Sequence, residues 1–393
     1  MNDMVGHRQK TLAKVVGEYF AGLQEPYSRL LGWEQDVSNG WLFAEAEAAF
    51  DATMSVNNVG DPWATISSEP IHTKPFERAL VQFFARSYHD DPEAIWGCTT
   101  PGGSYSNLQA LLVARDRLKD NVLGFYSEAA HHSVPKAFHT LGIRTCEVGV
   151  DAGGVMRLDD VADVLRQHPE ARPVVVATAG TTLQGGIDDM VGLRALLEAH
   201  GQPFHLHCDA AFFGGYLFLL EKPVQGMNFG CFDSLAISGH KFFGLPIPIS
   251  VFCLKKEDQV VLGDRLCITE GACDVTLSGS RDGHTPLLWW YLVRRKGRGG
   301  LRQALRQAMA SRDHLCAALQ ERGYEVLPHD PRSLLLPVAG LPRDFMRRWG
   351  LPEARLRGRE VTRLTVMPHV DEAMVARFLG ELDAEALAQA SCC

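Results

Sequence analysis

"SLAISGHKFFGLPIPISVFCL", residues 234–254, places a lysine between two apolar runs of the chain. Both runs are typical of buried strands, because they are short and apolar and are bounded by Gly and Pro. Burying a lysine ammonium is costly unless the charge is paired or lost. Lys241 therefore either lies on a loop and reaches water, or stays neutral in an apolar pocket and attacks a carbonyl group, as Schiff-base lysines do. This segment alone leaves both interpretations open.

The overall composition indicates a soluble globular protein. The chain has 393 residues, 46% of them apolar and 22% charged, which favours a large domain with a smaller one. A net charge of −8 without a basic stripe argues against a nucleic-acid partner. No segment has the pattern of a signal peptide or the length of a membrane span. Ten scattered cysteines are typical of reduced thiols, so we expect a cytoplasmic protein.

Strand-like and helix-like segments alternate between residues 76 and 254. The helical segments are 76–89, 106–118, 133–142, 157–169 and 188–201, and the strand-like ones are 121–127, 144–150, 172–180, 203–210, 232–238 and 249–254. This alternation predicts an α/β fold with a mostly parallel sheet.

We expect three parts along the chain. They are a helical N-terminal arm at 1–60, a large domain at 61–297 and a small C-terminal α+β domain at 298–393. Strands near 324–328, 333–338 and 360–366 and helices near 342–349 and 371–389 are expected in the small domain, after a long helix that follows Gly297.

In open α/β sheets, ligands gather in the loops at the carboxyl ends of strands. One such loop, "CTTPGGSYSNLQALL" at 98–112, runs from Gly102 and Gly103 directly into a helix. Backbone N–H groups at a helix start bind phosphate, and glycine permits close approach. The alternative is an ordinary helix entry with Ser104 as its N-cap.

A second loop follows "PFHLHCDAAFFGG", residues 203–215. Strand alternation places His205, His207 and Asp209 on one face, which fits a metal site. In the alternative, Asp209 is the functional carboxylate and the histidines are packing residues. The small Ala210 and Ala211 then leave room for a flat ring.

Two further loops carry polar residues, "YSEAAHHSVPKAF" at 126–138 and "TAGTTLQGGID" at 178–188. Together the four loops and the lysine predict a pyridoxal 5′-phosphate (PLP) site, with Lys241 bonded to the cofactor. Gly103 and Ser104 would hold the phosphate.

The remaining groups would hold the cofactor ring. Asp209 would pair with the ring nitrogen, while His131 and Ala211 would cover the two ring faces. Opposite charges ~4 Å apart at an effective dielectric of ~20 attract by about 4 kcal/mol, or about three pK units, which keeps that nitrogen protonated near neutral pH.

Several separated motifs occur in an order typical of one family. They are "GDP" (60–62), "GTT" (180–182), "HCDAA" (207–211), "SGHK" (238–241) and "SGSRDGHTP" (278–286). The sequence resembles the group II PLP-dependent amino-acid decarboxylases, in the branch of the bacterial histidine decarboxylases and plant serine decarboxylases. The resemblance extends from about residue 56 to 370.

This resemblance implies an aspartate-aminotransferase-like architecture (PLP fold-type I) and a homodimer with active sites at the interface. It implies that Lys241 is the Schiff-base lysine, that Asp209 pairs with the ring nitrogen and that His131 stacks on the ring. Further cofactor contacts are implied for Ser238, His240 and either Thr181 or Thr182. The residues implied to line the substrate cleft or the dimer rim are Asn57, Asn58, Asp61, Ser280, Arg281 and His284.

The implied reaction is decarboxylation of an L-amino acid, histidine or another small polar one, to its amine and carbon dioxide. Many relatives protonate Cα with a loop tyrosine, whereas this chain has no tyrosine between Tyr216 and Tyr291. His132, which stands where tyrosine is frequent, or a water is the alternative proton source. The pair Tyr105-Ser106 likewise replaces the common Glu-Gly or Glu-Ala.

Three hypotheses remain open from the sequence. The first is simple decarboxylation. The second is a PLP enzyme with another outcome, either decarboxylative oxidative deamination to an aldehyde or aldol-type cleavage. The third is a metal-binding protein that uses His205, His207 and Asp209.

Overall fold

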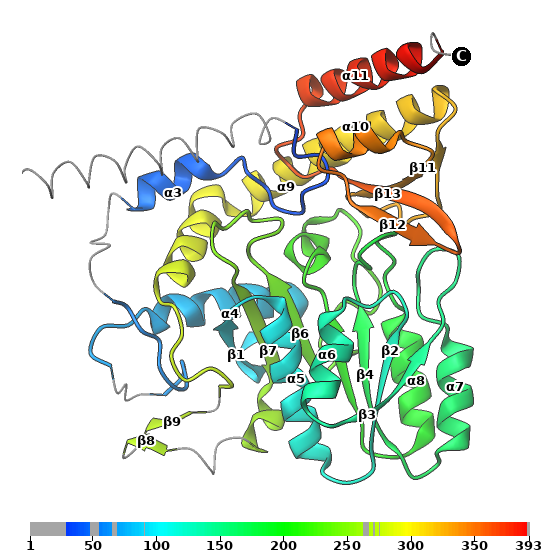
Figure 1. Cartoon of the computed structure of the whole chain (residues 1–393). Coiled ribbons are helices and arrows are strands. Elements are labelled where there is room, and N and C mark those ends of the chain that lie inside the picture. Colours follow the sequence, from blue (N-terminus) through cyan, green and yellow to red (C-terminus); the bar gives the residue numbers. More distant parts are fainter. Residues whose placement is uncertain are drawn as a thin grey trace, which may run out of the picture. The chain divides into compact units, whose positions relative to one another are not determined.

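The computed structural model describes residues 29–47, 55–64, 69–89, 91–261, 267–269, 272–274 and 276–390. Its chain forms two compact units (Figure 1). The larger unit holds residues 34–307 and 328–333, and the smaller unit holds the described residues up to Trp33 together with 308–327 and 334–390. The predicted division at 60/61 and 297/298 stays a prediction, and much of the expected N-terminal arm lies outside the described residues.

A seven-stranded sheet forms the centre of the larger unit, in the order β1-β7-β6-β5-β4-β2-β3. Its strands are β1 (Ile95–Thr100), β2 (Val122–Ser127), β3 (Arg144–Val148), β4 (Arg172–Thr178), β5 (His205–Asp209), β6 (Ser234–Ser238) and β7 (Ser250–Lys255). Only β7 runs antiparallel to its neighbours in this sheet. The predicted mostly parallel sheet is therefore confirmed.

The helices of the larger unit before α9 (His284–Glu321) are α3 (Gly40–Glu47), α4 (Lys74–Tyr88), α5 (Gly103–Leu118), α6 (Ser133–Thr140), α7 (Leu158–Gln167) and α8 (Met190–His200). Of these, α4, α5, α6 and α7 contact strands of this sheet. Helices α5 and α6 lie side by side against the sheet (Figure 1). Both ends of α8 are explained by local sequence. The Asp189 side chain caps the first turn by accepting from the amide of Gly192, and Gly201 ends the helix with φ 76°.

Strand β1 was not expected from the sequence, because Gly97 interrupts its apolar pattern. A Cβ atom at Gly97 would lie 2.3 Å from the carbonyl oxygen of Phe252 on β7 and 2.9 Å from Val81 on α4. Glycine is needed there because the neighbouring backbone approaches closely, which is a tertiary requirement.

The smaller unit contains a four-stranded antiparallel sheet in the order β10-β11-β13-β12. Its strands are β10 (Glu325–Val326), β11 (Leu335–Ala339), β12 (Glu353–Leu356) and β13 (Arg359–Thr365), and its helices are α10 (Arg343–Arg348) and α11 (Glu372–Ala390). Leu336, Phe345, Trp349, Leu364 and Phe378 are among the residues of its core. The expected α+β character is present, while β12 was not anticipated.

Helix α9 (His284–Glu321) starts earlier than the sequence predicted. Gly297 interrupts it with φ 60° and ψ 176°, so the glycine predicted to precede the helix divides it instead. A short pair of strands, β8 (Cys267–Thr269) and β9 (Ala272–Cys273), lies apart from both larger sheets in the pairing pattern. None of the described helices is long and apolar enough to cross a membrane.

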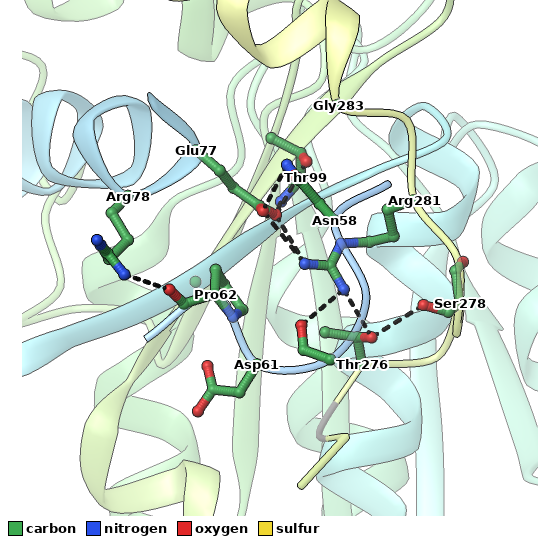
Figure 2. A network of polar contacts seen from close by, with 12 residues as sticks. Asn58, Asp61, Pro62, Glu77, Arg78, Thr99, Thr276, Ser278, Arg281 and Gly283 are labelled. Atoms are coloured by element: carbon green, nitrogen blue, oxygen red, sulfur yellow. Dashed lines mark hydrogen bonds and ion pairs between the residues drawn. The ribbon is translucent and has the colours of Figure 1, made fainter. Parts of the chain in front are cut away.

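A buried ion pair joins four segments of the larger unit (Figure 2). The Arg281 Nη2 atom lies 3.1 and 3.2 Å from the two carboxylate oxygens of Glu77, and both side chains are almost inaccessible to solvent. Thr99 donates to one of these oxygens and Asn58 donates to the other. Arg281 Nη1 donates to the carbonyl of Gly60 and to a threonine hydroxyl on its own segment. Residues 58–60, α4, β1 and the segment before α9 are thereby held together.

Removing the arginine from this pair should destabilise the protein strongly. Arg281→Met leaves the Glu77 carboxylate buried without its counter-ion, which costs about 3–5 kcal/mol in free energy of unfolding. Urea unfolding followed by fluorescence measures this. The matched control is Arg306→Met, which breaks the solvent-exposed pair with Glu221 and should leave the urea midpoint unchanged. Equal urea midpoints for the two variants would contradict the expected contribution of the buried pair to the free energy of unfolding.

Candidate active site

A cavity of about 300 Å³ lies at the carboxyl ends of the parallel strands in the larger unit. The loops after β1, β2, β4, β5 and β6 all contribute to its wall, as the general rule for open α/β sheets predicts. The predicted cofactor residues that line it are Gly103, Ser104, His131, Thr182, Asp209, Ala211, Ser238, His240 and Lys241. Thr181 does not line it, since the hydroxyl of Thr181 accepts from the amide of Gly186 and closes the loop after β4.

Lys241 lies between the two situations that the sequence left open. Its side chain is 17% exposed, so it is neither fully buried nor a solvated surface lysine, and its ammonium is 3.2 Å from a carboxylate oxygen of Glu34. The Nζ atom also lies 5.8 Å from the ring centre of Phe212. The charge is therefore paired inside a partly apolar cavity.

Glu34 was missed by the sequence analysis. It lies in a segment without a motif, and only the folded chain brings it to the lysine. Three hydrogen bonds fix this segment on the lysine loop. Asp36 donates its amide to the carbonyl of Lys241 at 3.0 Å, and the side chains of Gln35 and Asn39 donate to carbonyls of the same loop. Glu34 is thus held at the cavity by its neighbours in the sequence.

The amino end of α5 forms one wall of the cavity. Gly102 precedes the helix with φ 88°, a conformation that favours glycine. A Cβ atom at Gly103 would lie 3.0 Å from the hydroxyl of Ser238 and 3.2 Å from Cβ of Ala211, so a side chain there would fill the space. The first amides of a helix have no carbonyl partner inside it and attract anions. This wall is suited to a phosphate group.

Asp209 is the buried carboxylate of the cavity. One of its oxygens accepts from the amide nitrogen of Asn107 at 2.8 Å, and the other accepts from the backbone amide of Ala211 at 3.1 Å. Each oxygen of the carboxylate therefore has a donor. Asn107 was not anticipated, because nothing local marks a buried asparagine on α5 as a partner of a residue on β5.

His131 and His240 line the cavity as largely neutral rings. Burial is the main cause that lowers the pKa of His131, and the nearby Asp209 opposes it. Burial lowers the pKa of His240 as well, followed by the positive charge of Lys241. The adjacent His132 is exposed and lies against His131, with 4.0 Å between ring centres, and it is outside the cavity lining.

The hydroxyl of Thr178 supplies an independent test of what this cavity holds. It is buried at the end of β4, beside Asp209 in the sheet register, and has no hydrogen-bond partner among the described residues. Thr178 also lines the cavity. An orphaned hydroxyl next to a carboxylate, a small alanine, a lysine and a helix start fits a flat, phosphorylated, nitrogen-containing aldehyde. PLP has these groups, and the residues present fit it.

The geometry does not support metal binding by His205 and His207. Both rings are fully buried and are hydrogen-bonded to the hydroxyl of Ser234, and His207 is also hydrogen-bonded to Asn107. Within the described part of the chain, no group of three or more His, Cys, Asp or Glu side chains is arranged to hold a metal ion.

The predicted substrate residues form a separate cluster and are not among the residues that line the cavity. Asn57 and Ser280 bind each other at 3.1 Å, and Asn58 and Arg281 belong to the ion-pair network (Figure 2). Asp61 accepts from the ring nitrogen of Trp96, and His284 is the first residue of α9. Their role toward the substrate stays a prediction.

Comparisons with known proteins identify the family. Residues 52–336 match the pyridoxal-dependent decarboxylase conserved domain. A histidine decarboxylase of Mesorhizobium japonicum is 31% identical over 90% of this chain and 93% of its own length. Serine decarboxylase 1 of Oryza sativa is 28% identical over 97% of this chain and 77% of its length. An L-methionine decarboxylase from Streptomyces has the same fold, with a TM-score of 0.84 at 23% identity over 96% of this chain and 95% of that one.

The chain belongs to the pyridoxal-dependent decarboxylase family. It is a carboxy-lyase that uses PLP to decarboxylate an amino acid, and its fold is PLP fold-type I. The expectations of family, fold class, cofactor and general reaction are thereby confirmed.

The two buried histidines on β5 predict a loss of stability in acid. Burial lowers the pKa of His205 to about 4 and that of His207 to about 3. An unfolded chain protonates its histidines near pH 6.5, whereas the folded chain keeps these two neutral, so the unfolded state binds more protons below that pH. The free energy of unfolding should therefore fall as the pH drops from about 6.5 towards 4.

Urea unfolding at a series of pH values checks this expectation. His205→Gln should weaken the dependence between pH 6.5 and 4, because it removes one of the two groups. The exposed His139→Gln is the control and should keep the full dependence. The expectation fails if His205→Gln and the wild type lose stability in parallel.

Proposed function

We propose that this decarboxylase acts on histidine or another small polar L-amino acid and releases the amine and carbon dioxide. Two lines of support bear on the substrate. The relatives above with high coverage are named as histidine and serine decarboxylases. Glu34 and Asp209 are the two carboxylates in the described lining, and Asp209 is already engaged by Asn107 and Ala211. Glu34 pairs with Lys241 in this structure. In the proposed site the lysine nitrogen is bonded to the cofactor, and Glu34 then binds a substrate side chain that donates a hydrogen bond.

The position of Lys241 carries the proposal of a catalytic site. We propose that Lys241 holds the cofactor covalently, while Gly103, Ser104, Ser238 and His240 hold its phosphate, with Thr182 at the rim. When bound, PLP accepts the electron pair that the departing carboxylate leaves behind. Asp209, which accepts from Asn107 and Ala211, would face the ring nitrogen and hold a proton there.

The ring faces and the proton at Cα complete the proposed site. His131 covers one face of the ring and Ala211 covers the other. Phe212 lines the same cavity and limits water around the reacting carboxylate. Since the chain has no tyrosine between Tyr216 and Tyr291, the proton at Cα comes from a histidine or a water in this proposal.

The missing tyrosine also supports a second candidate outcome. If protonation is slow, molecular oxygen oxidises the decarboxylated substrate and is reduced to hydrogen peroxide, and water then releases the aldehyde and ammonia. Aldol-type cleavage is the other alternative outcome. Product mass and oxygen uptake distinguish these outcomes.

We further propose a cytoplasmic homodimer with its active sites at the interface. Tyr105 and Ile247 support the dimer, because these large apolar side chains are 46% and 47% exposed beside the cavity-lining Ser104 and Pro248. Light scattering of the holoenzyme tests the dimer, and a monomer mass would reject it. The location is supported by six free thiols, those of Cys98, Cys146, Cys208, Cys231, Cys253 and Cys316.

The first experiment is aerobic incubation of the PLP-loaded enzyme with a pool of amino acids. We expect one product with the mass of histidine, or of another small polar amino acid, less carbon dioxide, and no oxygen consumption. An aldehyde with oxygen uptake would replace simple decarboxylation by oxidative deamination. Consumption of apolar amino acids alone would reject the proposed substrate class.

Glu34→Gln tests the side-chain contact. If the carboxylate binds histidine, the variant should lose at least about tenfold in kcat/KM for histidine, since a hydrogen bond to a charged group contributes about 1.5–3 kcal/mol. Serine, with a shorter side chain, should be affected less. Glu45→Gln on the exposed surface is the control. An equal loss of kcat/KM for histidine and serine would show that Glu34 does not distinguish the two substrates.

Lys241→Ala tests the covalent site. The variant should fold normally, lack the yellow absorbance of lysine-bound PLP and have no measurable turnover. Circular dichroism, an absorbance spectrum and product assay check the three expectations. Normal turnover by this variant would reject the site assignment.

A further inference from the structure

A continuous chain of buried hydrogen bonds leads from Asp209 into the core below the cavity. It passes from Asp209 to Asn107, His207, Ser234 and His205, with successive distances of 2.8, 3.1, 2.8 and 2.8 Å. Asn107 is 1% exposed, and the other three core members are fully buried. Nothing in the proposed reaction uses His205 or His207, so the chain requires its own explanation.

The direction of every hydrogen bond in this chain follows from Asp209. Its carboxylate can only accept, so the atom of Asn107 that faces it must be the amide nitrogen. The amide oxygen of Asn107 then faces Nε2 of His207 and accepts from it. His207 therefore carries its hydrogen on Nε2.

The next links follow in the same way. A neutral His207 has a bare Nδ1, which accepts from the hydroxyl of Ser234. That hydroxyl has only one hydrogen, so it accepts from Nε2 of His205. Nδ1 of His205 lies 3.4 Å from the guanidinium of Arg117, which can only donate and is itself paired with Asp258. All donors therefore point towards Asp209, and the lowered pKa values of both histidines agree with neutral rings.

A second branch starts at the same asparagine. The amide nitrogen of Asn107 also donates to the hydroxyl of Ser133 at 3.2 Å. The Ser133 hydroxyl lies 2.8 Å from Nδ1 of His131, and the Ser133 backbone amide donates to that same nitrogen at 3.2 Å. Nδ1 of His131 thus accepts, and the neutral ring carries its hydrogen on Nε2.

We propose that His207 is a positioning residue that acts through Asn107 on Asp209. The amide nitrogen of Asn107 faces Asp209 and Ser133, and His207 donates to the amide oxygen on the other side. His207 thereby holds the asparagine with its nitrogen on the Asp209 carboxylate. This inference rests on the proposed role of Asp209, and it adds the group that keeps the donor of this carboxylate in place.

Two substitutions of His207 in the holoenzyme test the inference. His207→Phe keeps a flat ring but cannot donate, so the buried amide oxygen of Asn107 is left without its donor. We expect the dissociation constant for PLP to rise by about tenfold or more. We also expect the pH midpoint of the bound cofactor's visible absorbance to shift. His207→Gln has both a donor and an acceptor and should restore both properties.

Cys208→Ala is the matched control, since Cys208 is buried on the same strand and points to the other face. It should lower stability without changing PLP affinity or the absorbance midpoint. If His207→Phe does not fold, nitrogen NMR of the histidine-labelled wild-type holoenzyme tests the inference, and His207 should carry its hydrogen on Nε2.

The inference is overturned if His207→Phe folds and keeps wild-type PLP affinity and absorbance midpoint. It is also overturned if His207 in the wild-type holoenzyme carries its hydrogen on Nδ1. The nitrogen NMR readout needs no substrate and no turnover. A failure of the proposed substrate or reaction would therefore leave this test intact, and the two failures are distinguishable.

Discussion

The buried negative charge of Asp209 is the constraint on which the cavity depends. A carboxylate removed from water is stable only when donors replace its hydration, and the chain supplies them from Asn107 and from the backbone of Ala211. The asparagine comes from α5 and the alanine from the loop after β5, so the charge also fixes how this helix packs over the strand. The same helix presents its amino end to the cavity, which couples the ring end of the site to the phosphate end.

Lys241 provides the positive charge that balances this site. Its loop is held by segment 34–39, in which the amide of Asp36 and the side chains of Gln35 and Asn39 all donate to the loop's carbonyl groups. Glu34 belongs to the same segment and pairs with the lysine. Positioning the lysine and supplying its counter-charge are thus performed by one short piece of chain, which is a compact way of keeping a reactive amine in place.

The ion pair between Glu77 and Arg281 serves a different purpose. It lies outside the cavity and binds together segments that are more than 200 residues apart in the sequence. A buried pair gains little over apolar packing, but it is costly to leave half complete, so it defines one arrangement of these segments. The motif "SGSRDGHTP" is explained in part by this structural role, because its arginine forms the buried pair with Glu77.

The sequence by itself determined the class of fold and much of the site. Alternating apolar periods are a local property, so the parallel sheet and its helices were predictable. Asp209 ends a strand, and Lys241, His131 and the Gly102–Gly103 helix entry lie in the loops after strands. These residues come together because the carboxyl ends of parallel strands meet at one edge.

Only the tertiary structure decided what depends on contacts between distant segments. Glu34 and Asn107 have no local pattern, and Thr178 was one polar residue in a polar loop until its hydroxyl was found without a partner. Strand β1 was not predicted, because Gly97 interrupts its apolar pattern. Glycine is needed there because the backbone of β7 approaches too closely for a Cβ atom. The direction of each hydrogen bond below Asp209 was equally out of reach, because an amide or imidazole has two possible orientations and only its buried neighbours select one.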